Sequence, residues 1–392
     1  GPATAYCFKS VADQFSGRIN LLRVFSGTLP SDSHATCVRS GSKERLGQLF
    51  TLQGKEHVPL QEIGPGDIGA VAKLTETQTG DTLCAREKPV TLPAISFPDP
   101  AFSAAITPKT KADLDKMGSA LQRIVEEDPS LRLERSADGE TILSGLGDSH
   151  VEVALEKIRR KFNVELEMAL PRVPYRETVL GTAQAEYTHK KQTGGHGQFA
   201  RVTVTVEPLP RGGGHEFANK TVGGVVPKQY VGSVEKGVAE AMQEGVLAHY
   251  PMVDMKVKLV DGREHPVDSS DIAFKIAASQ AVKKGAQDAQ PVLLEPIMSM
   301  KITVPESNTG DIISDLNVKR ARVLGMTPMG SMTTVEAQAP LAEVQRYSAD
   351  MRSMTQGRGH FSMSFSHYEE VPANVAQKLI EAASREREAA KA

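Results

Sequence analysis

The spacing at which apolar residues recur among polar ones changes several times along the chain, and these changes predict where its domains lie. Between residues 6 and 92, short apolar–polar alternations are interrupted by turn residues such as those of Gly64–Asp67. This pattern is typical of a small β-barrel. The stretch 88–100 is rich in proline and predicts an extended linker. We therefore expect a first domain over residues 1–93.

Residues 94–171 follow the order strand, helix, strand, strand, helix, strand. The helix predicted over 110–127 brings Leu114, Met117 and Leu121 to one face, and the strand over 164–168 alternates apolar residues with glutamates. This order is that of a ferredoxin-like domain. It recurs over 295–392, with helices predicted at 309–319 and 341–355 and a closing helix at 373–389. Two ferredoxin-like domains therefore flank the middle of the chain.

The middle, residues 172–294, mixes strands with two helices. Strands at 184–190 and 198–206 are joined by Thr193–Gly197, whose glycines predict a hairpin tip where a partner can approach the backbone closely. A second loop, 261–268, precedes a helix opened by Ser269, Ser270 and Asp271, which suit the free donors of its first turn. We expect the apolar stripe of this helix to include Ile272.

Composition limits the classes of function. Apolar residues make up 40% and charged residues 24% of the chain, which indicates a folded globular protein. The formal net charge is −2, so any contact with RNA must be local. Three dispersed cysteines predict neither a zinc site nor a disulfide framework. Without an apolar stretch of membrane-spanning length or a signal-peptide pattern, we expect a cytoplasmic protein with no membrane partner.

Motifs of catalysis are missing from the sequence. The phosphate-binding pattern G-x-x-x-x-G-K-[ST] does not occur, nor do H-E-x-x-H or G-x-S-x-G. We therefore expect no catalytic residue, no metal site and no cofactor in these 392 residues. His150 and His265 are isolated histidines, which are more often structural or solvated than catalytic.

Several motifs occur together and in a fixed order, and they are far more specific than any one of them alone. They are Arg23–Leu29, Gly80–Leu83, Pro108–Asp113, Glu126–Pro129, Gly224–Lys228, Val267–Ser270, Ala273–Ile276, Gly310–Asn317, Leu324–Met326 and Thr355–Gly359. In combination they resemble elongation factor G over essentially the whole chain, beginning at the second domain of that family.

The resemblance implies a fold, a function and partners. It implies a multidomain protein, a β-barrel followed by α+β domains, in which two ferredoxin-like domains flank an S5-like α/β domain. It also implies a monomer that binds the ribosome and promotes translocation of tRNA and mRNA. The partners would be rRNA of both subunits, ribosomal proteins, and the tRNA and mRNA of the A site. GTP and Mg²⁺ would belong to the family's GTPase domain, which these residues do not include, so we expect this chain not to be an enzyme by itself.

The resemblance also implies roles for individual residues. It places the tip that reaches the decoding centre at Gly194, Gly195, His196, Gly197, Gln198 and His265. It gives contacts with the RNA backbone to Lys190, Lys191, Arg201, Lys319, Arg320, Arg322 and Arg358. It gives contacts with the small subunit or between domains to Lys109, Lys111 and His150. Polar, glycine-bearing turns are suited to reading the shape of paired RNA without reading its sequence.

The chain departs from the commonest translocases at a few positions. His196 and Phe199 stand where arginine and tyrosine are usual, and Asp148–His150 replaces Glu-Leu-His. These differences indicate a divergent paralogue. Two alternatives therefore remain: a recycling or ribosome-protection factor of the same superfamily, and an RNA-processing or phosphoryl-transfer enzyme that shares the fold of the middle domain. The second is disfavoured because Thr193–Gly197 lacks the serine-bearing glycine loop of such kinases.

Overall fold

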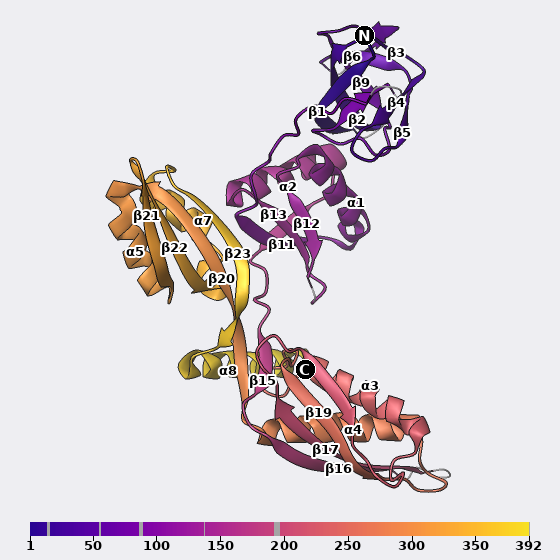
Figure 1. The fold of residues 1–392 in the computed structure, drawn as a ribbon, viewed down its shortest axis with the longest axis vertical. Helices are drawn as coiled ribbons and strands as arrows, with labels where there is room; N and C mark the ends of the chain where they lie inside the picture. Colours follow the sequence, from indigo (N-terminus) through magenta and orange to yellow (C-terminus); the bar gives the residue numbers. More distant parts are fainter. Residues whose placement is uncertain (14–15, 55, 86–88, 137, 192–196, 392) are drawn as a thin grey trace.

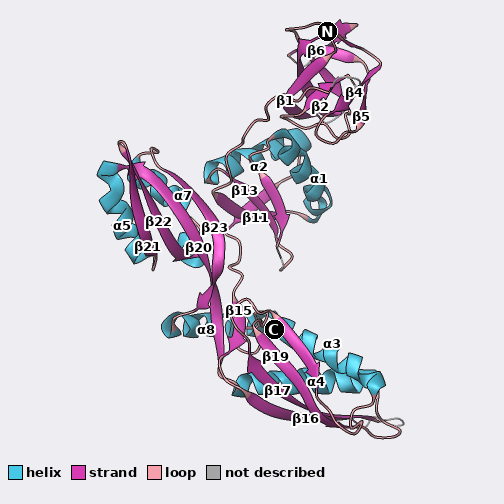
Figure 2. Ribbon diagram, in the orientation of Figure 1, coloured by secondary structure: helices cyan, strands magenta, loops and turns pink. Residues whose placement is uncertain are grey.

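The chain folds into four domains in an elongated molecule, in which the domain with β21–β23 lies beside the domain with α1 and α2 (Figures 1 and 2). The computed structural model describes residues 1–391 apart from 14–15, 55, 86–88, 137 and 192–196. We name the domains the β domain, the first α+β domain, the arm domain and the C-terminal domain. The arm domain lies at the opposite end of the molecule from the β domain (Figure 1). No helix of the described residues is long and apolar enough to cross a membrane.

The β domain is a curled sheet with side chains such as Leu22, Leu46 and Leu83 fully buried inside it. Its strands are β1 (Thr4–Asp13), β2 (Gly17–Ser26), β3 (Leu29–Pro30), β4 (Ser33–Cys37), β5 (Lys43–Leu46), β6 (Leu49–Gln53), β7 (Glu56–Leu60), β8 (Glu62–Ile63), β9 (Ile68–Ala72) and β10 (Thr82–Cys84). Eight of them form one sheet in the order β5-β4-β10-β1-β2-β9-β6-β7. In the pairing described, β5 and β7 end this sheet. The expected barrel is therefore a half-barrel, because no described pairing joins its two ends.

A buried glutamate stabilises the β domain. The side chain of Glu44 is 2% exposed, and its carboxylate accepts hydrogen bonds from the backbone N–H groups of Thr75, Glu76 and Thr77 at 2.7–2.9 Å. Burial alone would raise the pKa of Glu44, but these hydrogen bonds outweigh it and hold the pKa below the ordinary 4.5. The charged form is therefore the stabilising one.

We expect acid to remove this stabilisation. Because the folded-state pKa is depressed, the contribution of Glu44 is complete above the unfolded-state pKa and is lost as the pH falls through the folded-state pKa. The substitution Glu44→Gln should destabilise the β domain by about 1–3 kcal/mol at pH 7. Denaturation measured at pH 7 and pH 3 should show a smaller difference between variant and wild type at pH 3. An equal difference at both pH values would contradict the assignment.

The first α+β domain has the predicted order of elements. They are β11 (Phe102–Pro108), α1 (Lys111–Glu127), β12 (Arg132–Arg135), β13 (Thr141–Gly145), α2 (Asp148–Phe162) and β14 (Leu166–Ala169). The sheet order β12-β13-β11-β14 is antiparallel throughout, as in a split βαβ domain. Helix α1 is capped by Thr110, whose side chain forms a capping box with Asp113. Leu114 is 55% exposed, so it lies outside the predicted apolar face.

The C-terminal domain repeats this order with one difference. Its elements are β20 (Pro291–Pro305), the 3₁₀ turn η1 (Glu306–Asn308), α5 (Thr309–Val318), β21 (Arg322–Met329), β22 (Met332–Pro340), α6 (Leu341–Val344), α7 (Tyr347–Thr355), β23 (His360–Glu370) and α8 (Ala373–Lys391). The sheet order is β21-β22-β20-β23. The single helix predicted over 341–355 is wrong, because α6 and α7 are separate helices with a break at Gln345–Arg346.

The arm domain has a four-stranded sheet and two helices that pack against each other. Its elements are β15 (Arg176–Val179), β16 (Ala183–Lys191), β17 (Gln198–Pro208), β18 (His215–Asn219), α3 (Lys228–Glu244), β19 (Met255–Arg263) and α4 (Asp271–Asp288). The order is β16-β17-β19-β18, and only β18 and β19 run parallel. Helix α4 buries Ala273, Phe274 and Ala277. Ile272 is 61% exposed, so the predicted stripe is wrong at that position.

The arm and C-terminal domains are joined by continuous secondary structure. Strand β20 pairs with β15 at its beginning and with β22 and β23 further on, so it runs through the boundary that the sequence placed at 294/295. A small core of Tyr175, Ala248, Leu293 and Val371 lies beside this strand, and the apolar face of α8 packs on it. This connection is therefore a strand within a sheet, and not a linker.

Candidate nucleic-acid interface

Two turns of the arm domain lie at its free end. The pairing of β16 with β17 ends at Lys191 and Gln198, and the pairing of β17 with β19 ends at Arg201 and Arg263. The β16–β17 hairpin and the loop from β19 to α4 therefore leave the sheet at the same end, which is the free end of the molecule in Figures 1 and 2. We call this end, with residues 190–191, 197–201 and 264–270, the tip.

Asp268 holds the two turns together. Its carboxylate accepts a hydrogen bond from the backbone N–H of Gly197 at 3.0 Å, and its carbonyl oxygen accepts one from the N–H of Phe199 at 2.8 Å. The hydroxyl of Ser269 donates to the carbonyl of Phe199 at 2.8 Å. A Cβ at Gly197 would lie only 3.1 Å from the Asp268 carboxylate, so glycine permits this approach. Residues 197–199 at the start of β17 are therefore held against residues 268–269.

His265 sits in the second turn with half of its side chain exposed. Its Nδ1 accepts hydrogen bonds from the backbone N–H groups of Val267 at 3.3 Å and Asp268 at 3.2 Å. Because Nδ1 is an acceptor, the ring hydrogen is carried by Nε2, and the 3.4 Å approach of the Asp268 carboxylate to Nδ1 is not an ion pair in this state. The ring centroid lies 6.1 Å from that of Phe199. The Nε2–H is thus left as a donor toward a partner.

The other predicted tip residues differ in how freely they can bind. Gln198 engages His189, with 3.0 Å between its Oε1 and the imidazole Nε2. Arg201 lies 3.8 Å from Glu186 and 3.5 Å from Asp261, so it already forms ion pairs within the arm domain. The predicted contacts Lys190 and Lys191 are both exposed. Gly194, Gly195 and His196 lie outside the described residues.

Arg320 in the C-terminal domain is engaged within the protein. Its guanidinium binds both oxygens of Glu295 at 2.7 and 2.8 Å, and it binds Glu343 at 3.0 Å. Glu295 is 2% exposed, so this ion pair is buried at the junction with the arm domain. The guanidinium of Arg320 is therefore already engaged by two carboxylates, and its contact with RNA stays a prediction. Its signal in the sequence, a basic cluster, does not distinguish a surface charge from a buried ion pair.

The remaining basic candidates of this domain differ in how exposed they are to solvent. Lys319 lies 3.0 Å from Asp315 and 3.1 Å from Asp350, and only 17% of its side chain is exposed. Arg322 is 64% exposed and lies 3.2 Å from Glu369. Arg358 donates to the carbonyl of Thr355 at 3.3 Å. Arg322 and Arg358 are therefore exposed, whereas Lys319 is largely covered.

The residues of the first α+β domain that were predicted to contact the small subunit or another domain are also exposed to different degrees. Lys109 lies 3.3 Å from Glu165 and Lys111 is exposed, so both ammonium groups face solvent. His150 accepts the backbone N–H of Leu146 on Nδ1 at 3.1 Å, and its Nε2 lies 2.9 Å from Asp128. Both ring nitrogens are satisfied within the domain. The role of His150 is therefore to support the start of α2.

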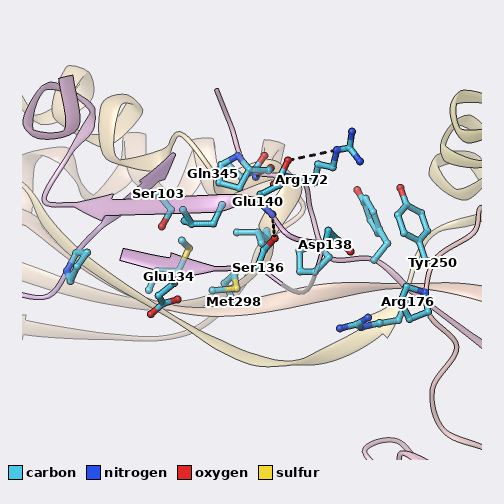
Figure 3. Close-up of a pocket in the computed structure, with 18 of the residues that line it drawn as sticks. Ser103, Glu134, Ser136, Asp138, Glu140, Arg172, Arg176, Tyr250, Met298 and Gln345 are labelled. Atoms are coloured by element: carbon cyan, nitrogen blue, oxygen red, sulfur yellow. Dashed lines mark hydrogen bonds and ion pairs between the residues drawn. The ribbon is translucent and has the colours of Figure 1, made fainter. Parts of the chain in front are cut away.

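A cavity of about 390 Å³ lies between domains (Figure 3). The β12–β13 hairpin contributes Glu134 and Glu140, the segment 171–176 passes beside it, and Met298 comes from β20. Arg172 binds Glu140 across this space, with 3.1 Å from its backbone nitrogen to the carboxylate. Burial, and then the charge of Glu295, raise the pKa of Tyr175 in its wall to about 12. The described residues contain no group of side chains arranged to hold a metal ion.

Asp268 and Ser269 are not among the functional residues that the sequence predicts, although they lie in the motif Val267–Ser270. Both connect the two turns rather than face a partner. The available signal was an aspartate and a serine directly before the start of α4, which by itself is read as helix capping. Only the pairing of distant segments shows what they hold.

Comparison with known proteins gives one consistent result. Family models of elongation factor G match the chain in order: its domain 2 over residues 2–86, its domain III over 97–170, its domain IV over 171–290 and its C-terminus over 292–379. An elongation factor G-like protein of Thermotoga maritima is 46% identical over 387 residues, which are 98% of this chain and 57% of that protein. A crystal structure of a Thermus thermophilus protein superposes with a TM-score of 0.84 at 39% identity, covering 98% of this chain and 58% of the other.

Proposed function

Because this chain belongs to the elongation factor G family and comprises its domains II to V, we propose that it is the ribosome-binding part of a factor that promotes translocation of tRNA and mRNA. The chain spans less than two thirds of the length of the relatives named above. No GTPase domain lies within its 392 residues, and the phosphate-binding motif is missing from its sequence. GTP and Mg²⁺ would be bound by a GTPase domain, and not by these residues.

The observation that carries the proposal is the tip held together by Asp268. Two glycine- and histidine-bearing turns are joined by hydrogen bonds of 2.8–3.0 Å at the end of an arm. Paired RNA presents 2′-hydroxyls and base edges in a wide, shallow minor groove, which rigid polar turns can contact without reading sequence. His265 would donate from Nε2 to such a groove. Lys190 and Lys191 would hold the neighbouring phosphates.

The remaining domains would position this arm. We assign the arm domain to the S5-like fold and the two antiparallel βαββαβ domains beside it to the ferredoxin-like fold. Arg322 and Arg358 would contact rRNA of the large subunit, and Lys109 and Lys111 would face the small subunit. The long strand β20 would transmit force, because a strand that is paired within one sheet on both sides of the domain boundary does not bend as a linker does.

Translocation by a chimaera tests this proposal. A GTPase domain of the elongation factor G family would be placed before residue 1, and movement of mRNA would be followed on ribosomes with tRNA in the A site. We expect translocation by the chimaera and a several-fold slower rate for His265→Ala. His215→Ala is the matched control, because this exposed histidine begins β18 at the far end of the same sheet. Equal rates for both variants would remove the tip from the proposed site.

A further inference from the structure

A third exposed turn lies at the tip beside the two already described. It comprises residues 220–224 and connects β18 to α3. Strand β18 runs parallel to β19, with Asn219 opposite Leu259, so its carboxyl end points toward the tip. Adjacent strands lie roughly 5 Å apart, and the order β16-β17-β19-β18 therefore places the third turn directly beside β19, beginning at the level of Leu259. The third turn extends the tip on the side of β18.

The segment around this turn is firmly anchored to the second turn. Val226 is buried, and its side chain occupies the place where a Cβ at Gly262 would lie, 2.4 Å away. The hydroxyl of Tyr230 donates to the carbonyl of Ser269 at 3.3 Å, and its ring stacks on Phe274 with centroids 4.6 Å apart. Because these contacts fix the turn on its α3 side, its position relative to His265 is defined.

The chemistry of the third turn suits a phosphate backbone. Residues 219–230 include Lys220 and Lys228, which are exposed, and no aspartate or glutamate, in a chain whose net charge is −2. Neither lysine takes part in an ion pair between described residues. Gly223 and Gly224 both have positive φ, at +73° and +74°, and space is open around both. In the described chain, the backbone N–H groups of Gly223 and Gly224 make no hydrogen bond. They are therefore free donors.

Val222 is the most exposed large apolar side chain recorded in the protein, at 85%. On a glycine turn flanked by lysines, such a side chain can lie against a ribose while the lysines bind the phosphates on either side. A protein partner would instead favour a wider apolar patch. The turn has only this one strongly exposed apolar side chain. The balance of charge and apolar surface therefore favours RNA.

We propose that the third turn is a contact site for the sugar–phosphate backbone of one RNA strand, next to the duplex that the other two turns contact. This inference rests on the proposed function, since it places RNA at the tip. Lys220 and Lys228 would each neutralise a phosphate, the free N–H groups of Gly223 and Gly224 would bind its oxygens, and Val222 would cover the sugar.

Salt dependence tests the contact. Affinity of the whole 392-residue chain for ribosomes would be measured over a range of salt concentrations for wild type and for Lys220→Ala/Lys228→Ala. Each lost phosphate contact lowers the slope of log affinity against log salt by about 0.7 on a single strand, so we expect a decrease of about 1.4. Lys236→Ala/Lys284→Ala is the matched control, because these are also exposed lysines of α3 and α4 but lie further along both helices. The control should keep the wild-type slope.

The outcomes separate the two proposals. If the wild type does not bind ribosomes, the proposed function fails and this inference fails with it. If the wild type binds and the Lys220→Ala/Lys228→Ala slope equals that of the control, only the third turn is refuted. Lys220→Arg/Lys228→Arg should restore the slope, because the charges are kept. Loss of binding without a change of slope would mean a structural defect and would also overturn the contact.

Crosslinking identifies the partner directly. The three native cysteines are buried, so a short photo-crosslinker can be attached selectively to Val222→Cys. We expect crosslinks to RNA in the ribosome complex. Crosslinks to a ribosomal protein alone would overturn the assignment of RNA as the partner, whatever the salt dependence.

Discussion

Replacing Asp268 by alanine is expected to slow translocation by the chimaera about tenfold. The substitution removes the carboxylate that accepts the N–H of Gly197 and so separates the hairpin from the second turn. A hydrogen bond to a charged group contributes about 1.5–3 kcal/mol, and 1.4 kcal/mol corresponds to a factor of ten in an equilibrium constant. The fraction of molecules in which the two turns are correctly placed should fall by a similar factor. The rate of mRNA movement should fall with that fraction.

Two further variants make this prediction specific. Asp268→Asn keeps an acceptor oxygen for Gly197 and should lose less activity than alanine. Glu216→Ala removes a carboxylate from the opposite end of the same sheet, where Glu216 pairs with Lys256, and should leave the rate unchanged. If Asp268→Ala translocates as fast as wild type, the joining of the two turns has no functional role.

Replacing Glu177 by alanine is expected to open the base of the arm domain. Glu177 is fully buried in β15, and its carboxylate accepts N–H groups from Val246, Leu247, Ala248 and Tyr250 at 2.6–3.1 Å. Without the carboxylate, these donors lose their acceptor in the interior. Removing one side of such a network costs about 3–5 kcal/mol. The loop after α3 should therefore open far more often.

Hydrogen exchange is the appropriate measurement, because a multidomain chain does not unfold in one two-state transition. We expect the amides of residues 246–250 to exchange about a hundredfold faster in Glu177→Ala, which corresponds to roughly 3 kcal/mol of local stability. Glu177→Gln should show a smaller increase, since one acceptor oxygen remains. Glu235→Ala, which removes an exposed carboxylate from α3, is the control. Unchanged exchange in Glu177→Ala would show that water replaces the carboxylate.

Local patterns predicted the elements well where a single amphipathic face decides the structure. The helix predicted over 110–127 forms as α1 over Lys111–Glu127, and Ser270 caps α4 by accepting the N–H of Ala273. Prediction was wrong where an element meets two partners. Ile272 was placed in a buried stripe, but α4 packs on both α3 and the sheet and buries alanines instead. The periodicity of apolar residues predicts one buried face of a helix, and it does not predict which residues are buried when the helix packs on two partners.

Local sequence patterns also do not predict which charged residues form buried ion pairs. Arg320 and Arg322 are neighbours in one basic cluster, yet Arg320 binds the buried Glu295 and Arg322 is 64% exposed. Their partners are 25 and 47 residues away in the chain. No local pattern contains that information, because the folded backbone decides which partner each charged side chain faces.

The sequence by itself determined the order of the elements, the family and the candidate turns, because turn residues, caps and apolar periodicity act over a few neighbouring residues. The tertiary structure alone decided which turns meet, through Asp268, and how the arm is attached, through β20. It also decided that the first sheet remains a half-barrel. These features depend on contacts between residues far apart in the chain, whose geometry exists only once the sheets have formed.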